Sequence, residues 1–147
     1  MKLSTRGRYG TRAMLDLAMH DGANSVLLKD IAKRQAISQR YLENIMRLLV
    51  SSGLAASVQG RNGGFSLAKK PSDIKLSQII QVVEGSISPV FCVDNPKLCK
   101  RKSDCVIYDI WSKLKGAMFD VLDSITLEDM VKMQKDKIIE SQITYHI

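Results

Sequence analysis

The sequence predicts a mainly α-helical protein with a winged helix-turn-helix, a small β-hairpin wing and a long C-terminal dimerisation helix. Three observations support this prediction. Apolar residues recur at helical spacing in several segments, and only two residues separate the second segment from the third. A glycine-rich basic turn then joins two short runs typical of strands. A further helical stripe near the C-terminus is wider than one small core needs.

The bulk composition bounds the class of protein. The chain has 147 residues, 45% of them hydrophobic and 25% charged, which is typical of a folded globular protein. No apolar run is long enough to span a bilayer and no secretory signal is present, so we expect a cytoplasmic protein without a membrane partner. We expect a winged-helix domain over 1–85, a cysteine-bearing cluster-binding loop over 86–104, a dimerisation helix over 105–125, and a C-terminal segment and tail over 126–147.

Two helices are predicted before the turn. Ser4 or Thr5 is a suitable N-cap for the first helix, which we expect to run to about Asp21 and to end at Gly22. The second helix is expected over residues 28–35, with its apolar side chains facing inward.

The third helix has a well-specified start and a polar outer face. Ser38 is a good N-cap, and Ile37 can pack on Leu42 as a hydrophobic staple. The polar face can exchange hydrogen bonds with base edges and phosphates. An ordinary solvated face is the alternative, but the short preceding turn favours DNA recognition. The polar residues opposite the apolar stripe are Arg40, Glu43, Asn44 and Arg47.

A β-hairpin is predicted after the third helix. Its strands are expected over 54–58 and 64–68, with glycine and Asn62 supplying the positive φ of the turn. Arg61 is at the tip, where it could enter a minor groove. The alternative is an incidental charge on a loop.

The net charge of +7 is distributed unevenly. Residues 1–70 contain 12 Lys and Arg against 4 Asp and Glu, whereas residues 71–147 contain 10 against 11. All the excess positive charge therefore lies in the first half, which points to a polyanionic partner, most often nucleic acid. A basic surface kept for solubility is the alternative.

Three cysteines, Cys92, Cys99 and Cys105, lie in or next to a segment without helical or strand periodicity. Their spacing is Cys-x6-Cys-x5-Cys, and thiolates suit iron–sulfur clusters, zinc or cuprous copper. Three unrelated thiols are the alternative. A fourth ligand is not obvious from the sequence, and the candidates are Tyr108, Asp104, Asp109 and Glu43.

The helix predicted over about 105–124 has an apolar seam at alternating spacings of three and four residues. We interpret it as a dimerisation helix, with packing inside one chain as the alternative. Thr126 can cap a short segment, Leu127 to Met133, and a polar, mobile tail is expected beyond it. The seam consists of Ile107, Ile110, Leu114, Ala117 and Val121.

Several motifs, in the same order along the chain, resemble those of one regulator family. They are Met1-Lys2-Leu3-Ser4-Thr5-Arg6-Gly7-Arg8-Tyr9, Ile37-Ser38-Gln39-Arg40-Tyr41-Leu42-Glu43, Gly63-Gly64-Phe65 and Val83-Glu84-Gly85. The chain resembles the IscR-type iron–sulfur cluster regulators, whose parent group also includes NsrR and CymR, to about Met133.

The resemblance implies a homodimeric transcription regulator, most often a repressor, that binds a double-stranded DNA operator. It also implies that Cys92, Cys99 and Cys105 hold a [2Fe–2S] cluster that senses iron–sulfur, redox or nitrosative status. Glu43 and Tyr108 are the candidate further ligands; Tyr108 stands where many relatives have histidine, and a phenol is the poorer ligand. The predicted DNA-contacting residues are Arg8, Tyr9, Ser38, Gln39, Arg40, Tyr41, Glu43, Asn44, Arg47, Gln59, Arg61 and Gly63.

Two alternatives stay open at this stage. The first is a cluster-free regulator of cysteine or sulfur metabolism, controlled by a partner protein or by thiol oxidation; the stretch Ser86-Ile87-Ser88-Pro89-Val90 is similar to the CymR branch. The second is an iron–sulfur electron-transfer protein or enzyme. The sequence has no nucleotide-binding loop and no nucleophile with a base, so we expect neither an enzyme nor a small-molecule substrate.

Overall fold

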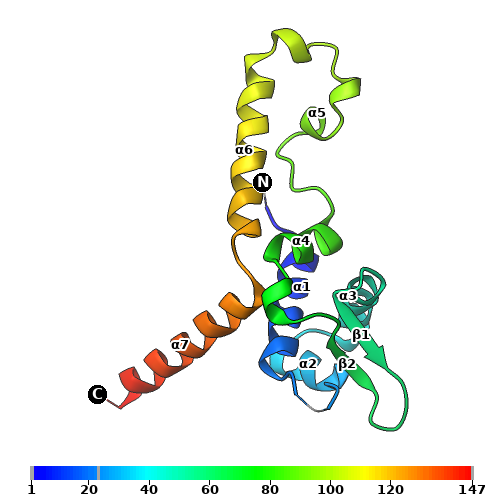
Figure 1. Ribbon diagram of the computed structural model, residues 1–147, viewed down its shortest axis with the longest axis vertical. Coiled ribbons are helices and arrows are strands. Elements are labelled where there is room, and N and C mark those ends of the chain that lie inside the picture. The colour runs from blue at the N-terminus through cyan, green and yellow to red at the C-terminus, as the bar shows by residue number, and fades with distance from the viewer. Residues whose placement is uncertain (1, 23, 147) are drawn as a thin grey trace.

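The computed structural model describes residues 2–22 and 24–146 and shows a winged-helix body from which the two long C-terminal helices project in different directions (Figure 1). Met1, which opens the first family-like motif, lies outside the described residues. No helix in the described part of the chain is both long and apolar enough to cross a membrane. In chain order the elements are α1 (Thr5–Met19), α2 (Leu28–Gln35), α3 (Gln39–Ser51), β1 (Ala55–Val58), β2 (Gly64–Leu67), η1 (Pro71–Asp73), α4 (Leu76–Glu84), α5 (Phe91–Asp94), η2 (Pro96–Leu98), η3 (Lys102–Asp104), α6 (Val106–Asp123) and α7 (Leu127–Tyr145).

One hydrophobic core holds the winged-helix body together. It is built from the apolar faces of α1 to α4 and from the start of β1, and it confirms the inward faces that helical periodicity predicts. Leu127, the first residue of α7, is also fully buried there. The C-terminal part of the chain is therefore anchored in the body. The largest fully buried side chains include Met14, Leu17, Ile31, Leu42, Ile45, Met46, Leu49, Ile74, Ile79 and Ile80.

Helix α1 packs closely on α4 through two glycines. A Cβ at Gly7 would lie 2.3 Å from the Glu84 carboxylate, and one at Gly10 would lie 2.8 Å from the Val83 side chain. Ser4 caps α1, as predicted, by accepting the Gly7 backbone N–H at 3.2 Å. Because these positions lack side chains, the α1 and α4 backbones approach closely enough to move together.

The predicted end of α1 is two residues too late. The helix ends at Met19, and His20 has left helical geometry with φ −112° and ψ 14°. Its backbone N–H still bonds the carbonyl of Asp16 at 3.1 Å, and Asp21 donates to Ala18 at 3.4 Å. The last turn therefore tightens into a cap before Gly22 is reached.

The turn between α2 and α3 contains Ala36 in the left-handed conformation, with φ 53°. Its backbone N–H and that of Ile37 bond carbonyls in the last turn of α2, a common way to end a helix. At the end of α2, the buried Asp16 carboxylate of α1 accepts three hydrogen bonds from the Arg34 guanidinium, at 2.7, 3.0 and 3.3 Å, and one from Gln35 at 2.8 Å. This network fixes α2, and with it the turn, against α1.

The C-terminal end of helix α6 is joined to the body by hydrogen bonds between residues far apart in the sequence, and α6 also packs against α4. The Leu76 N–H donates to the Ile125 carbonyl at 2.9 Å, and the Leu127 N–H donates to the Ile74 carbonyl at 2.8 Å. Beside this bridge, the Asp123 carboxylate accepts from Lys75 at 2.8 Å and from Ser77 at 2.7 Å. The N-terminal half of α6 projects beyond the body, alongside the loop that carries α5 (Figure 1).

The prediction of a mobile tail after Met133 is wrong, because α7 continues as a helix to Tyr145. Thr126 is the N-cap, as predicted, and it exchanges hydrogen bonds with Asp129 in a capping box. The segment after Met133 contains no Gly or Pro, so nothing in its sequence stops a helix once it has started.

Candidate DNA interface and cysteine-bearing loop

The outer face of α3 forms the first part of the candidate DNA interface. Ser38 caps the helix, and its hydroxyl accepts the Tyr41 backbone N–H at 3.2 Å. Glu43 and Arg47 form an ion pair at 3.6 Å on this face, with both side chains largely exposed. Because the apolar face of α3 is buried, its polar side chains are all available to a partner. The predicted α3 residues that are exposed are Ser38, Gln39, Arg40, Tyr41, Glu43, Asn44 and Arg47.

Aromatic and cationic side chains connect α1 with the start of α3. The rings of Tyr9 and Tyr41 meet edge to face, with centroids 5.8 Å apart. The guanidinium groups of Arg8 and Arg12 lie 5.9 and 5.5 Å from the centre of the Tyr9 ring. Arg12 also donates to the Gln35 side chain at 3.1 Å. The result is a cluster of positive charge held beside α3.

A surface hollow of about 660 Å³ separates the start of α1 from α3. It is lined by Thr5 and Arg6 on one side and by Asn44 and Arg47 on the other. Thr5 and Arg6 are not in the predicted DNA-contacting set, although they belong to the same N-terminal motif as Arg8. Only the packing of α1 beside α3 shows that Arg6 and Arg47 face the same hollow.

The wing is an antiparallel hairpin whose strands pair from Ala55 with Leu67 to Val58 with Gly64. The predicted positive φ is found at Gly60, at 113°, whereas the same expectation for Asn62 is wrong. The loop over residues 59–63 is longer than a two-residue hairpin turn and closes through a hydrogen bond from the Gly63 N–H to the Gly60 carbonyl. One residue with positive φ is therefore enough to reverse the chain.

The segment before α2 supports the wing from one side. Val26 and Phe65 exchange backbone hydrogen bonds at 2.7 and 2.8 Å, and the Ser25 hydroxyl donates to the Asn62 carbonyl at 2.8 Å. A Cβ at Gly64 would lie 2.3 Å from the Val26 carbonyl oxygen, so glycine is required there. The tip residues Gln59 and Arg61 are exposed.

The three cysteines are distributed over the segment that leads into α6. Cys92 lies in α5, Cys99 follows η2, and Cys105 is the N-cap residue of α6. All three are half-buried free thiols. The segment is attached to α6 by an ion pair between Asp94 and Lys115 at 2.8 Å. The hydrogen bond from Lys115, and to a smaller extent the one from Ser86, holds the pKa of the Asp94 carboxyl below its ordinary value.

The segment suits a thiolate-bound metal centre by ligand type, but its thiols are not assembled. Within 2–22 and 24–146, no three His, Cys, Asp or Glu side chains are grouped closely enough to hold a metal ion. The elements α5, η2 and η3 are single turns that belong to no sheet, so the thiols can converge without breaking the core. Cys92, Cys99 and Cys105 thus offer three soft ligands on a pliable segment.

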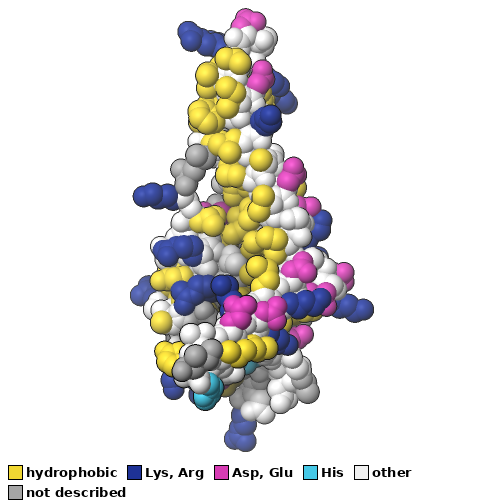
Figure 2. All heavy atoms as spheres, turned by 90° about the vertical axis from the view of Figure 1, so that its left-hand side faces the viewer, with side chains coloured by type: hydrophobic (Ala, Val, Ile, Leu, Met, Phe, Trp, Pro, Cys, Tyr) yellow, Lys and Arg dark blue, Asp and Glu magenta, His cyan; other side chains and the backbone are white. Residues whose placement is uncertain are grey.

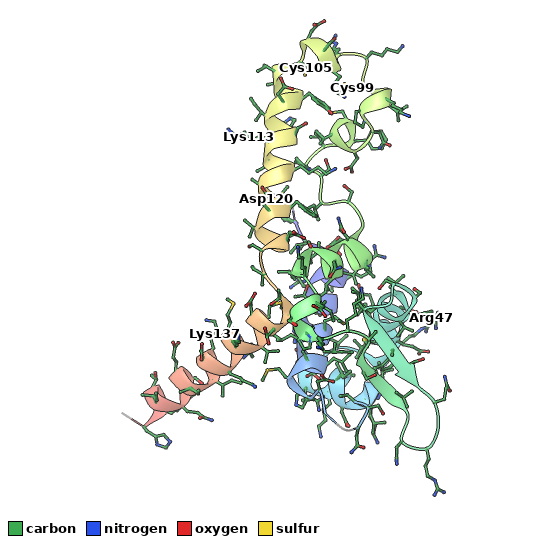
Figure 3. The ribbon with its side chains drawn as sticks, viewed as in Figure 1. Arg47, Cys99, Cys105, Lys113, Asp120 and Lys137 are labelled. Carbon is green, nitrogen blue, oxygen red and sulfur yellow. The ribbon has the colours of Figure 1, made fainter. Side chains whose placement is uncertain are left out.

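The two candidate further ligands, Glu43 and Tyr108, lie at different distances along the molecule from the cysteine segment, since Tyr108 is bonded through its backbone N–H to Cys105 whereas Glu43 is on α3. Figure 3 shows Cys99 and Cys105 at the outer end of α6, well away from Arg47, the ion-pair partner of Glu43 on α3. Within one copy of the chain, Glu43 is therefore remote from the cysteines. Tyr108 is one turn into α6, and the Lys102 ammonium lies 5.6 Å from the centre of its ring. Both remain predictions as cluster ligands.

A continuous apolar stripe runs along the outer side of α6 (Figure 2). Ile107 and Ile110 are each 50% exposed and Val121 is 61% exposed, although they occupy seam positions at helical spacing. Half or more of each of these side chains is thus exposed within one chain, and dimerisation through this stripe stays a prediction. An unpartnered apolar stripe of this length is typical of a surface that another protein covers.

The model of the Rrf2 family, described as iron-dependent transcriptional regulators, matches residues 3–133. The chain belongs to the Rrf2 family. It is 41% identical to protein rrf2 of Nitratidesulfovibrio vulgaris, with 90% of this chain and 88% of the relative covered.

Two solved Rrf2-family structures confirm the winged-helix fold. T. potens IscR has a TM-score of 0.76 and 43% identity, with 93% of this chain and 90% of that chain covered. CymR, the global cysteine regulator of B. subtilis, has a TM-score of 0.74 and 38% identity, covering 90% and 98%. The resemblance to the IscR-type group is confirmed, and the chain is a transcription regulator of the DNA-binding type. The family match ends at Met133, so the last three turns of α7 lie beyond it.

Proposed function

We propose that this Rrf2 protein is a homodimeric, cytoplasmic repressor that binds its operator with α3 and the wing, under the control of a [2Fe–2S] cluster. The single observation that carries the cluster part is the placement of three free thiols on one segment tied to α6. The thiols of Cys92, Cys99 and Cys105 would hold the cluster. When bound, it would supply a group that responds to iron supply and oxidants.

The DNA part of the proposal rests on charge and exposure. Arg40 and Arg47 project from α3, Arg6 and Arg8 lie beside it, and Arg61 stands at the wing tip. A helix of this kind enters the major groove, and its dimeric partner reads a second half-site about one helical turn away. Since each neutralised phosphate contributes about −0.9 to the slope of log affinity against log salt, we expect a steep salt dependence.

The dimer part of the proposal rests on the apolar stripe of α6. A second copy would bury Ile107, Ile110 and Val121, and because each is 50–61% exposed, each would contribute half or a little more of the roughly 1.5–3 kcal/mol of complete burial, which is about 0.8–1.8 kcal/mol. In a two-fold symmetric dimer, the stripe of one copy would pack against the same stripe of the other, and one interface would bury these side chains in both copies.

One specific observation favours an alternative form of control. The thiols stand apart, and a related structure is that of CymR, a global cysteine regulator. Under this alternative the protein binds DNA without a cluster and responds to a partner protein or to thiol oxidation at the same cysteines.

The decisive experiment is anaerobic purification followed by absorption spectroscopy and assays of iron and sulfide. The cluster proposal predicts a reddish-brown protein with about two iron and two sulfide per chain, as the [2Fe–2S] stoichiometry requires. A Cys92/Cys99/Cys105 triple serine variant should lose the colour and change its operator affinity. A colourless protein that binds the operator tightly, even after reconstitution with iron and sulfide, would contradict the cluster proposal.

The same triple variant separates the alternatives. If the wild type is colourless and only the wild type loses operator binding on oxidation, thiol oxidation is the signal. If both proteins bind the operator equally and ignore iron and oxidants, control by a partner protein follows. Salt-independent or absent DNA binding would contradict the regulator proposal itself.

A further inference from the structure

A cavity of about 520 Å³ lies between the end of α4, the α5 segment and the inner side of α6. Its polar lining comes from separate parts of the chain: Gln81 of α4, Ser86 of the following loop, Asp94 of α5, and Tyr108, Ser112 and Lys115 of α6. This volume falls in the usual range for small-molecule sites, which combine a largely apolar wall with a few convergent polar groups. Val93 and Phe119 supply apolar parts of the wall.

The Ser112 hydroxyl is the most informative group in this cavity. Over the part of the chain that the structure describes, it is the one buried side-chain polar atom without a hydrogen-bond partner. A buried hydroxyl normally bonds to protein or to a bound molecule, because leaving it unpaired costs free energy. Ser112 lines the cavity, and rotation about its χ1 breaks no hydrogen bond in the free protein, so this rotation would bring the hydroxyl to a molecule bound there.

The cavity also presents one charge of each sign. The Lys115 ammonium and the Asp94 carboxylate are 2.8 Å apart, and both line the cavity. Lys115 has three N–H donors and Asp94 has two acceptor oxygens, so each keeps bonding capacity after their mutual contact. A simple anion would be repelled by Asp94 and a simple cation by Lys115, whereas a molecule carrying both charges can complement the pair.

The cavity faces away from the apolar stripe of α6. At 100° per residue, the mean direction of Tyr108, Ser112 and Lys115 lies roughly 150° from that of the seam residues around Ile110. A second copy that packs on the stripe therefore leaves the cavity free. Figure 3 labels Lys113 and Asp120 on the same helix, and neither lines the cavity.

We propose that this cavity binds a small zwitterion of the α-amino acid class, with its carboxylate held by Lys115 and Ser112 and its ammonium group held by Asp94. The short apolar wall suits a small aliphatic side chain. A molecule bound there would contact α4, α6 and the segment next to Cys92 at the same time. It would therefore link these three elements, and this link depends neither on a bound cluster nor on oxidation of the thiols.

The test uses the full-length protein and L-2-aminobutyrate as the probe, measured by calorimetry and by chemical-shift perturbation. We expect a Kd tighter than about 1 mM, and binding at least about tenfold weaker for butyrate and for propylamine, which each carry one of the two charges. The Ser112→Ala variant should bind about tenfold more weakly while it unfolds at an unchanged midpoint, since its hydroxyl bonds nothing in the free protein.

Charge variants provide a second, independent measurement. Lys115→Met and Asp94→Asn should each abolish detectable binding, whereas the matched controls Lys113→Met and Asp120→Asn on the same helix should bind as the wild type does. No heat and no shift change up to about 10 mM probe would overturn the proposal. So would butyrate or propylamine binding as tightly as the amino acid, or wild-type affinity in Ser112→Ala. None of these measurements involves DNA or iron, so their failure leaves the proposed function untouched.

Discussion

The Arg34→Met variant tests whether the buried carboxylate of Asp16 holds the helix-turn-helix against α1. The Asp16 side chain is 1% exposed and depends on Arg34 for its charge balance. Removing one partner of a fully buried pair costs about 3–5 kcal/mol, because the other charge is left unpaired. Arg34 is 35% exposed and Gln35 keeps its bond to Asp16, so we expect a smaller loss of about 2–3 kcal/mol.

The pH dependence gives this prediction a sign. Burial by itself would raise the pKa of Asp16, but hydrogen bonds from Arg34 and Gln35 outweigh it and hold the pKa below 3.8. A lowered folded-state pKa contributes stability that is present above the unfolded value and is lost as the pH falls through the folded value. Without Arg34, burial dominates and raises the pKa. The stability gap between wild type and variant should therefore be largest at neutral pH and shrink toward pH 4 and below.

Urea denaturation followed by circular dichroism measures both effects, at one fixed protein concentration because the proposed dimerisation would make stability depend on concentration. Arg47→Met is the matched control: its ion pair is exposed, at 71% for Arg47, so its loss should change stability by less than about 0.5 kcal/mol. Adding Asp16→Asn to Arg34→Met should restore at least half of the lost stability. A loss below about 1 kcal/mol at pH 7, or a gap that does not change with pH, would refute the reasoning.

Three further predictions concern DNA, the dimer and α6. Arg40→Ala should weaken operator binding by about 1–3 kcal/mol and relax sequence preference, and a gel shift with unchanged affinity and preference would reject a base contact. Ile110→Glu should yield monomers in sedimentation, because it places a charge in the apolar stripe; undiminished dimers at low micromolar concentration would contradict the seam. Gly116→Ala should stabilise the protein by about 0.5–1 kcal/mol, since a Cβ there meets no atom within 4 Å and alanine favours helix; an unchanged or lower melting midpoint would count against it.

Local rules predicted the parts of the fold that local chemistry determines. An oxygen-bearing side chain before a helical stripe predicts Ser38 and Thr126 as N-caps and either Ser4 or Thr5 for the first helix; the hydroxyls of Ser4, Ser38 and Thr126 accept the expected backbone N–H. The bounds of α2 and the two strands were also found to within about one residue, since glycines and apolar periodicity mark them.

The missed features depend on groups that are distant in sequence or on a weak signal. The polar composition after Met133 suggested a tail, but α7 continues because nothing breaks it. The contact between Tyr9 and Tyr41 and the position of Arg6 beside Arg47 follow only from the packing of α1 on α3. The cavity at Ser112 joins residues of α4, α5 and α6, and no spacing in the sequence could reveal it.

The arrangement of contacts restricts how an event at the cysteines can reach α3. The segment bearing Cys92 contacts α6 through the Asp94–Lys115 ion pair, and α6 is bonded to the start of α4 through Asp123. Helix α4 in turn packs closely on α1 at Gly7 and Gly10. Contiguous contact transmits a signal only if one element on the route has two arrangements. The α1–α4 pair is in close contact at Gly7 and Gly10, whereas Cys99 lies between single turns outside the core, where a second arrangement costs less packing. Switching should therefore arise in the cysteine segment and move α6 relative to the body, which changes the spacing of two α3 helices in a dimer rather than the shape of either one.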